Sequence, residues 1–318
     1  MCTAVAYKTK SHYFGRNLDL EYSYDESVTI VPRNYMFKFK RAEAISTHYA
    51  MIGMAYVVDE YPLFYDATNE AGLSMAGLNF PQNAYYEECR VGGEVHEISP
   101  FEFIPWILAQ CTNISEVRRL LASTVLVAIH FSEKLSLSPL HWIISDRNES
   151  IVVEPLKEGL KVYDNPVEVL TNNPTFDWHM MNLNNYVNLT TGEPEGGKWL
   201  DVEFNCYSRG MGAIGLPGDW SSSSRFVRAV YVRNNSVSGE SEQESVSQFM
   251  HILDSVAMSR GSVRLENDKY EITVYSSCCN TDTGTYYYKT YNDCRVKAVD
   301  MRGEDLEGSR LIKFSVSM

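Results

Sequence analysis

The first twenty residues, MCTAVAYKTKSHYFGRNLDL, restrict the fold of this chain more than any other stretch. Residues 2–9 and 12–20 are extended, apolar-rich runs, and the polar residues between them favour a turn. The pattern therefore predicts a β-hairpin at the N-terminus. Such a hairpin would fold Arg16 and Asp19 back toward Cys2.

Cys2 directly follows the initiator methionine, and this position permits nucleophilic chemistry. If Met1 is removed, Cys2 carries both a thiol and a free α-amine. A thiol becomes a good nucleophile when it loses its proton, and a cation such as Arg16 favours the thiolate. A free α-amine is partly neutral near pH 7 and can accept a proton. Asp19 could orient that amine or pair with Arg16 in a salt bridge, and Cys2 could also be an ordinary small apolar residue.

The rest of the chain alternates between groups of strands and groups of helices. Strands are expected at residues 49–58, 64–80, 140–146 and 150–156 and again in the C-terminal part, with helices at 99–111, 115–122, 176–187, from 224 onward, and at 242–258. This order predicts an α+β fold in which two mainly antiparallel sheets face each other and helices cover the outside. No linker is visible, so residues 1–318 are expected to form a single domain. Residues 189–224 are rich in Gly, Ser, Pro and Thr and predict a long excursion of the kind that is often functional or assembles subunits.

The composition excludes several classes of function. The formal net charge of −13 argues against sequence-independent binding to nucleic acid or to an anionic membrane. No apolar run approaches the roughly 20 residues that span a bilayer, and no targeting segment is visible, so we expect a cytoplasmic protein. The seven cysteines lack paired C-x-x-C spacing and the histidines lack an H-E-x-x-H arrangement. We therefore expect no disulfide framework, no metal and no other cofactor.

Polar residues at predicted strand ends and at a predicted helix start are further candidates. Asn79 follows the run GLSMAGL, and Asn172 and Asn173 follow EVLT. An asparagine amide can donate to a developing oxyanion, although each of these residues could equally cap a turn. Arg225 follows four serines at a helix start, where a cation opposes the helix dipole unless a carboxylate or thiolate offsets it. The alternative for Arg225 is a solvated side chain.

Apolar residues near Asn79 could form a substrate pocket. Phe64, Tyr65, Phe80 and residues 135–140 provide aromatic and aliphatic surface there. Such a pocket would suit a bulky apolar acyl group. Aromatic residues at strand spacing are, however, more often core or cross-strand packing.

Landmarks along nearly the whole chain resemble one known family. The start MCTAVAYKT and FGRNLDLEYS are followed, in order, by AGLNFP (76–81), LTNNPTFDWH (170–179), GLPGDWSSSSRFVRA (215–229) and FMHILDSVAMSRGSVR (249–264). Together they resemble the choloylglycine hydrolase family. The resemblance implies an N-terminal nucleophile hydrolase with a four-layer αββα sandwich that cleaves a C–N amide bond.

The same resemblance assigns a catalytic set. Its members are Cys2, Arg16, Asp19, Asn79, Asn172 and Arg225. In this assignment Cys2 is the nucleophile and its own α-amine the proton acceptor. Asn79 and Asn172 would bind the oxyanion, and the three charged residues would hold and polarise this centre.

Within the family, Asn79 in GLNFP resembles bile salt hydrolases, whereas penicillin V acylases tend to have Tyr at this position. The implied substrates are glycine- and taurine-conjugated bile salts, and the implied assembly is a homotetramer clasped by residues 189–224. The expected pocket residues are Leu18, Leu20, Val58, Tyr65 and Phe80. The alternatives are a penicillin V acylase, a glutamine amidotransferase, although its landmarks differ, and a non-catalytic binder of apolar anions.

Overall fold

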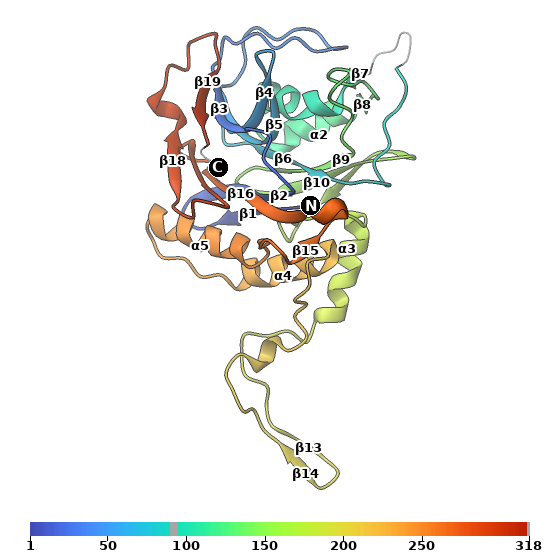
Figure 1. Cartoon of the computed structure of the whole chain (residues 1–318), viewed down its shortest axis with the longest axis vertical. Helices are drawn as coiled ribbons and strands as arrows, with labels where there is room; N and C mark the ends of the chain where they lie inside the picture. Colours follow the sequence, from blue (N-terminus) through green and yellow to red (C-terminus); the bar gives the residue numbers. More distant parts are fainter. Residues whose placement is uncertain (90–94, 317–318) are drawn as a thin grey trace.

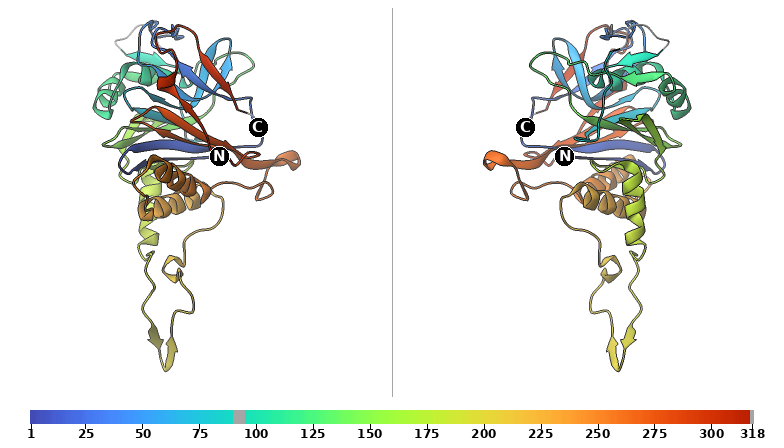
Figure 2. Two further views of the ribbon diagram at one scale, coloured as in Figure 1. Left: turned by 90° about the vertical axis from the view of Figure 1, so that its left-hand side faces the viewer. Right: turned by 90° about the vertical axis from the view of Figure 1, so that its right-hand side faces the viewer.

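The computed structural model describes residues 1–89 and 95–316. Two large sheets face each other, and helices cover their outer sides (Figure 1 and Figure 2). The first sheet contains β1 (Cys2–Lys8), β2 (His12–Leu20), β12 (Val169–Leu170), β15 (Val263–Arg264), β16 (Tyr270–Asn280), β17 (Thr285–Thr290) and β18 (Lys297–Asp300), in the order β12-β1-β2-β16-β17-β18 with β15 beside β16. The second contains β3 (Ser27–Val31), β4 (Met51–Val58), β5 (Tyr61–Asn69), β6 (Ser74–Asn79), β9 (Leu140–Ser145), β10 (Ser150–Leu156), β11 (Gly159–Asp164) and β19 (Ile312–Ser315), in the order β11-β10-β9-β6-β5-β4-β3-β19.

The helices complete the outer layers. The second sheet is covered by α1 (Phe103–Gln110) and α2 (Ile114–Leu121), and the first by α3 (Phe176–Asn182), α4 (Ser222–Asn235) and α5 (Glu242–Asp254) (Figure 1). All strand pairs within the two large sheets are antiparallel. The predicted α+β fold with αββα layers is confirmed.

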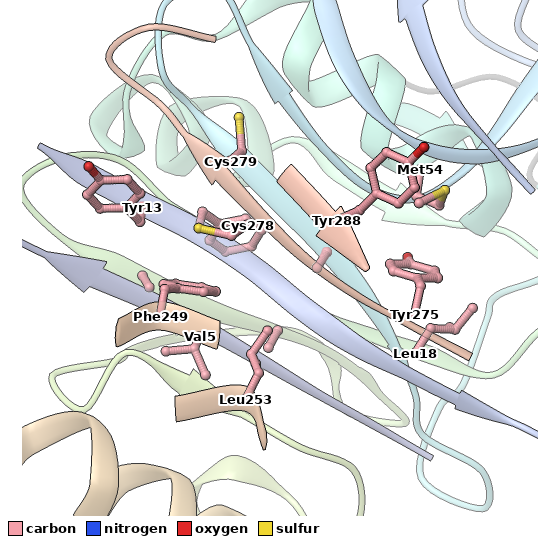
Figure 3. Close-up of a cluster of buried hydrophobic side chains, with 14 of the residues drawn as sticks. Val5, Tyr13, Leu18, Met54, Phe249, Leu253, Tyr275, Cys278, Cys279 and Tyr288 are labelled. Carbon is pink, nitrogen blue, oxygen red and sulfur yellow. The ribbon is translucent and has the colours of Figure 1, made fainter. Parts of the chain in front are cut away.

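Strand β1 of the first sheet is buried on both faces. Every residue of β1 except Lys8 is buried, because the second sheet covers one side of the strand and helices cover the other. Figure 3 shows this core where Val5 of β1 meets Phe249 and Leu253 of α5. Burial of apolar side chains on both faces therefore fixes the strand that carries Cys2.

Several predicted element boundaries differ from the observed ones. The helix expected at 99–111 begins with a 3₁₀ turn, η1 (Pro100–Glu102), in which the Glu102 carboxylate accepts from the backbone N–H of Ser99 at 3.2 Å. The helix expected at 242–258 ends at Asp254. These differences lie at element ends, which hydrophobic periodicity defines poorly.

The predicted excursion projects away from the layered body (Figure 2). It ends at Ser221, because α4 begins at Ser222, whereas the prediction extended it to residue 224. Its tip is a short hairpin of β13 (Gly197–Trp199) and β14 (Val202–Phe204), where Trp199 is 77% and Leu200 95% exposed. A separate small parallel pair joins β7 (His96–Ile98) to β8 (Thr124–Leu126). In the part of the chain that the structure describes, no helix is long and apolar enough to cross a membrane.

Candidate active site

The N-terminal hairpin brings the first candidates together, as predicted. In the β1–β2 pair Cys2 lies opposite Leu18, and Ala4 lies opposite Arg16. On the other side of β2, Asp19 lies opposite Thr273 of β16. Cys2 is 3% exposed, and Arg16 and Asp19 are fully buried. The hairpin therefore places a thiol, a cation and a carboxylate in one buried region.

The backbone nitrogen of Cys2 has a defined partner. It donates to Oδ1 of Asn172 at 2.9 Å, across the first sheet from β1 to the end of β12. The Met1 amine donates to the carbonyl oxygen of Asp19 at 2.7 Å and forms an ion pair with Glu271. With Met1 in place, the α-amine therefore belongs to Met1 and lies close to Asp19.

Only one of the two oxygens of the Asp19 carboxylate has a hydrogen-bond partner among the described residues. Its Oδ1 accepts from the Thr273 hydroxyl at 2.6 Å. Its Oδ2 is buried without a hydrogen-bond partner among the described residues and lies 4.0 Å from Nη1 of Arg225. Burial raises the pKa of Asp19, and the positive charge of Arg225 opposes that rise. One carboxylate oxygen is thus free to accept a proton donor at this centre.

Arg16 extends from β2 toward the second sheet. Its Nη1 donates to the backbone oxygens of Tyr65 at 2.9 Å and Gly77 at 2.6 Å, whereas its buried Nη2 has no partner among the described residues. Burial opposes the charged form, but the neighbouring Cys2, Tyr275 and Asp66 raise the pKa of Arg16 above its ordinary value. Arg16 therefore remains a cation beside the thiol.

Arg225 is also fully buried, so the alternative of a solvated side chain is wrong. Its Nη1 donates to the Cys2 carbonyl oxygen at 2.5 Å and to the Thr3 hydroxyl at 2.7 Å, and its Nη2 donates to Oδ1 of Asn172 at 2.7 Å. Burial lowers the pKa of Arg225, and Asp19 and Cys2 oppose that effect. Arg225 thus ties β1, the strand that carries Cys2, to Asn172.

The structure distinguishes the two residues of the asparagine doublet. Nδ2 of Asn172 donates to the Asn79 carbonyl oxygen at 2.7 Å, so Asn172 links the end of β12 to the end of β6. Asn173 points elsewhere, with its Nδ2 donating to Pro81 and Asn83. Asn79 itself is exposed, and it lines the cavity described next. An asparagine Nδ2 carries two N–H groups, so Asn172 retains one for a further acceptor.

A cavity of about 530 Å³ opens at Cys2. Its lining is mostly apolar and comes from β2, the β4–β6 strands, the start of α1, β9 and the segment before β9. The lining residues are Cys2, Arg16, Leu18, Leu20, Tyr22, Tyr24, Tyr56, Leu63, Phe64, Tyr65, Gly77, Asn79, Pro100, Phe101, Ile104, Phe131, Lys134, Leu135, Ser136, Leu137, Ser138, Leu140 and Trp142. The only charged side chains in this set are Arg16 and Lys134.

The structure places three of the five predicted pocket residues at this cavity. Leu18, Leu20 and Tyr65 line the cavity, as do Phe64 and most of residues 135–140. Val58 and Phe80 do not. Phe80 is fully buried and stacks on His141 with a centroid distance of 4.1 Å, because it lies just beyond the end of β6 and turns into the core.

Val58 is the last residue of β4, where it pairs with Tyr61 away from the cavity. Sequence reasoning missed Tyr22, Tyr24, Phe101 and Phe131, which reach the cavity from segments outside the regular strands. Hydrophobic pattern carries little information on where such segments turn.

The family model for linear amide C–N hydrolases of the choloylglycine hydrolase family matches residues 2–314. The chain belongs to the choloylglycine hydrolase family. The resemblance seen in the sequence landmarks is thereby confirmed, and with it the membership of a family of amide hydrolases.

Relatives of nearly full length support this membership. The bile salt hydrolase/transferase of Lactiplantibacillus plantarum is 50% identical over 99% of this chain and 96% of its own length. The protein of that name from Clostridium perfringens is 41% identical over 98% and 95% of the two chains. A crystal structure of a variant of the Clostridium perfringens conjugated bile acid hydrolase superposes with a TM-score of 0.92 at 40% identity, covering 100% of this chain and 97% of that one.

The fold extends beyond these relatives. The penicillin V acylase of Agrobacterium tumefaciens superposes with a TM-score of 0.77 over 99% of this chain and 91% of its own, at 19% identity. At that identity the likeness concerns the fold alone.

Proposed function

We propose that this protein hydrolyses the amide bond of glycine- and taurine-conjugated bile salts, with Cys2 as the nucleophile. The observation that carries the proposal is the position of Cys2 at a largely apolar cavity of about 530 Å³. That volume is within the range of small-molecule sites, and a rigid sterol body needs an apolar wall of this kind. Relatives named bile salt hydrolases at up to 50% identity support the same substrate class.

The charge of the cavity also favours an anionic substrate. The chain as a whole has a formal net charge of −13, yet no Asp or Glu is among the described residues that line the cavity. The charged lining residues are the cations Arg16 and Lys134. A conjugated bile salt carries a carboxylate or sulfonate next to its amide, and a cavity without carboxylates avoids repelling that group.

Removal of Met1 completes the catalytic centre in this proposal. The backbone nitrogen of Cys2 would become a primary amine that keeps its contact with Oδ1 of Asn172, now 2.9 Å away. The unpartnered Oδ2 of Asp19 would accept from the same amine. Arg16 would stabilise the Cys2 thiolate by its positive charge.

Hydrolysis would then take two steps. The α-amine of Cys2 takes the proton of the thiol. The resulting thiolate attacks the amide carbon and forms a tetrahedral oxyanion, which accepts hydrogen bonds from the amides of Asn79 and Asn172. The C–N bond breaks, the α-amine of Cys2 passes a proton to the departing nitrogen, and glycine or taurine leaves. Water, deprotonated by the α-amine, attacks the Cys2 thioester, and the free bile acid and the thiolate are restored.

A substrate panel tests this assignment. Initial rates on glycocholate, taurocholate and penicillin V should show substantial turnover of at least one conjugated bile salt and a lower kcat/KM on penicillin V. A higher kcat/KM on penicillin V would favour the acylase alternative. Tight binding of bile salts without release of glycine or taurine would favour the non-catalytic binder.

We further propose that the 189–221 excursion joins subunits into a homotetramer of single-domain chains. Its exposed Trp199 and Leu200 need a partner surface to leave water. Replacing both by Ser should reduce the mass found by light scattering, whereas Val237→Ser, at an 85% exposed position outside the excursion, should not. A tetramer that survives the double replacement would exclude this role. All cysteines are free thiols, which suits the reducing cytoplasm that we propose for this enzyme.

A further inference from the structure

A group of buried polar side chains supports the two segments that carry Asn79 and Asn172. Its members are His141 on β9, Glu154 on β10 and His179 on α3, and all three are fully buried. They do not line the cavity, and the hydrolytic steps above do not use them. A buried histidine pair and a buried carboxylate beside a reaction centre call for a reason.

His141 contacts the neighbours of both asparagines. Its Nε2 lies 2.9 Å from the carbonyl oxygen of Thr171, the residue before Asn172. Its ring lies parallel to the ring of Phe80, the residue after Asn79, with an angle of 7° between them. One imidazole therefore fixes the distance between the two segments.

Thr171 determines which nitrogen of His141 carries a proton, and Glu154 faces the other nitrogen. The carbonyl oxygen of Thr171 can only accept, so Nε2 must be protonated. Nδ1 lies 3.1 Å from Oε1 of Glu154, which also accepts from the backbone N–H of Phe176 at 3.0 Å. A carboxyl group can complete the hydrogen bond between Oε1 and Nδ1 from either side, so the Nε2–H group stays directed at Thr171.

His179 holds the next carbonyl group along the chain. Its Nε2 lies 2.9 Å from the backbone oxygen of Asn172, and its ring stacks on Phe226, the residue after Arg225. Burial lowers the pKa of His179 to about 4, so at neutral pH the ring has a single proton, which its Nε2 donates to Asn172. From the other side, the hydroxyl of Ser222 accepts from the backbone N–H of Asn172 at 2.8 Å.

We propose that Glu154 and His141 are positioning residues for hydrolysis, which hold residues 79–80 and 171–172 so that both asparagine amides face one developing oxyanion. The role rests on the proposed hydrolytic function. Oxyanion donors act only when they are held rigidly, and a displacement of about 1 Å can lower a rate about 100-fold. The hydrogen bond between Glu154 and His141 holds the ring so that its Nε2–H group faces Thr171.

Glu154→Gln tests the role with almost no change in volume. The glutamine oxygen would keep the bond from Phe176 N–H and would accept from Nδ1 of His141. A neutral imidazole would then present a bare Nε2 to the Thr171 carbonyl and would release the segment. We expect kcat on the preferred bile salt to fall about 10- to 100-fold, with KM within about twofold. His141→Phe, which keeps a ring beside Phe80, should show the same kcat-against-KM pattern.

His12→Phe is the matched control, because it removes another buried histidine from β2. His12 contacts the hydroxyls of Thr281 at 3.0 Å and Ser145 at 3.3 Å, away from the asparagines. If kcat falls as much in His12→Phe as in His141→Phe, the loss reflects general destabilisation, and the positioning role is overturned. If the wild type hydrolyses bile salts and Glu154→Gln has the same kcat, the positioning role is overturned and the hydrolytic function stands. If the wild type shows no turnover, the hydrolytic function is refuted and the positioning role with it.

Nitrogen-15 spectra of histidine in the wild-type protein give a second test that does not depend on a variant folding. The expected signal for His141 is that of a ring protonated at Nε2 and hydrogen-bonded at Nδ1. A ring protonated at Nδ1 alone would overturn the proposal.

Discussion

Arg225 provides the sharpest test of how the buried charges hold the reaction centre. Its guanidinium makes four hydrogen bonds to Trp220, Cys2, Thr3 and Asn172, at distances of 3.1, 2.5, 2.7 and 2.7 Å. A lysine would retain the charge, but its ammonium group could not donate to all of these partners at once as the planar guanidinium group does. Hydrogen bonds to charged groups contribute about 1.5 to 3 kcal/mol each, so the loss of two in Arg225→Lys should cost about 3 to 6 kcal/mol of unfolding free energy.

Arg225→Met should cost more, because it also leaves the Asp19 carboxylate without its cation. Removing one partner of a buried ion pair lowers the unfolding free energy by about 3 to 5 kcal/mol more. Native domains are stable by only about 5 to 15 kcal/mol, so this variant should be close to unfolding at 25 °C. Burial already raises the pKa of Asp19, and loss of Arg225 should raise it further. The folded state would then bind the Asp19 proton more tightly than the unfolded chain, so the deficit should shrink as the pH falls.

Urea unfolding, followed by tryptophan fluorescence at pH 7 and pH 5, measures these differences. We expect stability to fall in the order wild type, Arg225→Lys, Arg225→Met, with a smaller difference in unfolding free energy between the two variants at pH 5. The second replacement Asp19→Asn in the Arg225→Met background should recover part of the loss. A fully active Arg225→Lys protein whose unfolding free energy lies within about 0.5 kcal/mol of the wild type would show that the four hydrogen bonds of Arg225 do not hold this centre.

Two further predictions concern the asparagine doublet and a buried histidine. Asn172→Ala should lower kcat about 100- to 1,000-fold through loss of an oxyanion donor, whereas Asn173→Ala, at the neighbouring position bonded to Pro81 and Asn83, should change it only a few-fold; equal losses would contradict the assignment. Burial lowers the pKa of His12 from 6.5 to about 4, so the folded state binds this proton less readily than the unfolded chain. The stability that neutral His12 contributes should therefore decrease as the pH falls from 6.5 toward 4. Urea denaturation between pH 6.5 and 4 should show that the unfolding free energy of His12→Gln depends on pH less steeply than that of the wild type, by up to about 1.4 kcal/mol per pH unit. The same pH dependence in both proteins would show that His12 does not titrate in this way.

Local pattern was sufficient for the N-terminal half of the site. Alternating apolar residues and a polar turn predict the hairpin, and the hairpin alone places Arg16 and Asp19 near Cys2. The layered α+β architecture likewise followed from the order of strand and helix patterns, because each element must bury one face against another layer.

Residues brought in from distant segments could not be found in this way. Asn79, Asn172 and Arg225 converge through pairing between β12 and β1 and through the position of α4, which depend on contacts over more than a hundred residues. Spacing alone left each of them as an ordinary cap or surface residue, and only the family resemblance selected them. Phe80 is predicted to line the pocket because it follows Asn79, but its ring stacks on His141 in the core. Proximity in sequence to a site residue therefore does not show which way a side chain faces.

The most direct test of the central claim compares glycine and taurine release by the wild-type protein and by Cys2→Ser, with Met1 removal in both verified by intact mass. We expect the wild type to release glycine or taurine from a conjugated bile salt, and its mass to increase by that of the bound acyl group when the reaction is quenched early. Cys2→Ser should lose nearly all turnover while it still binds the substrate. Turnover by Cys2→Ser at the wild-type rate would show that Cys2 is not the nucleophile.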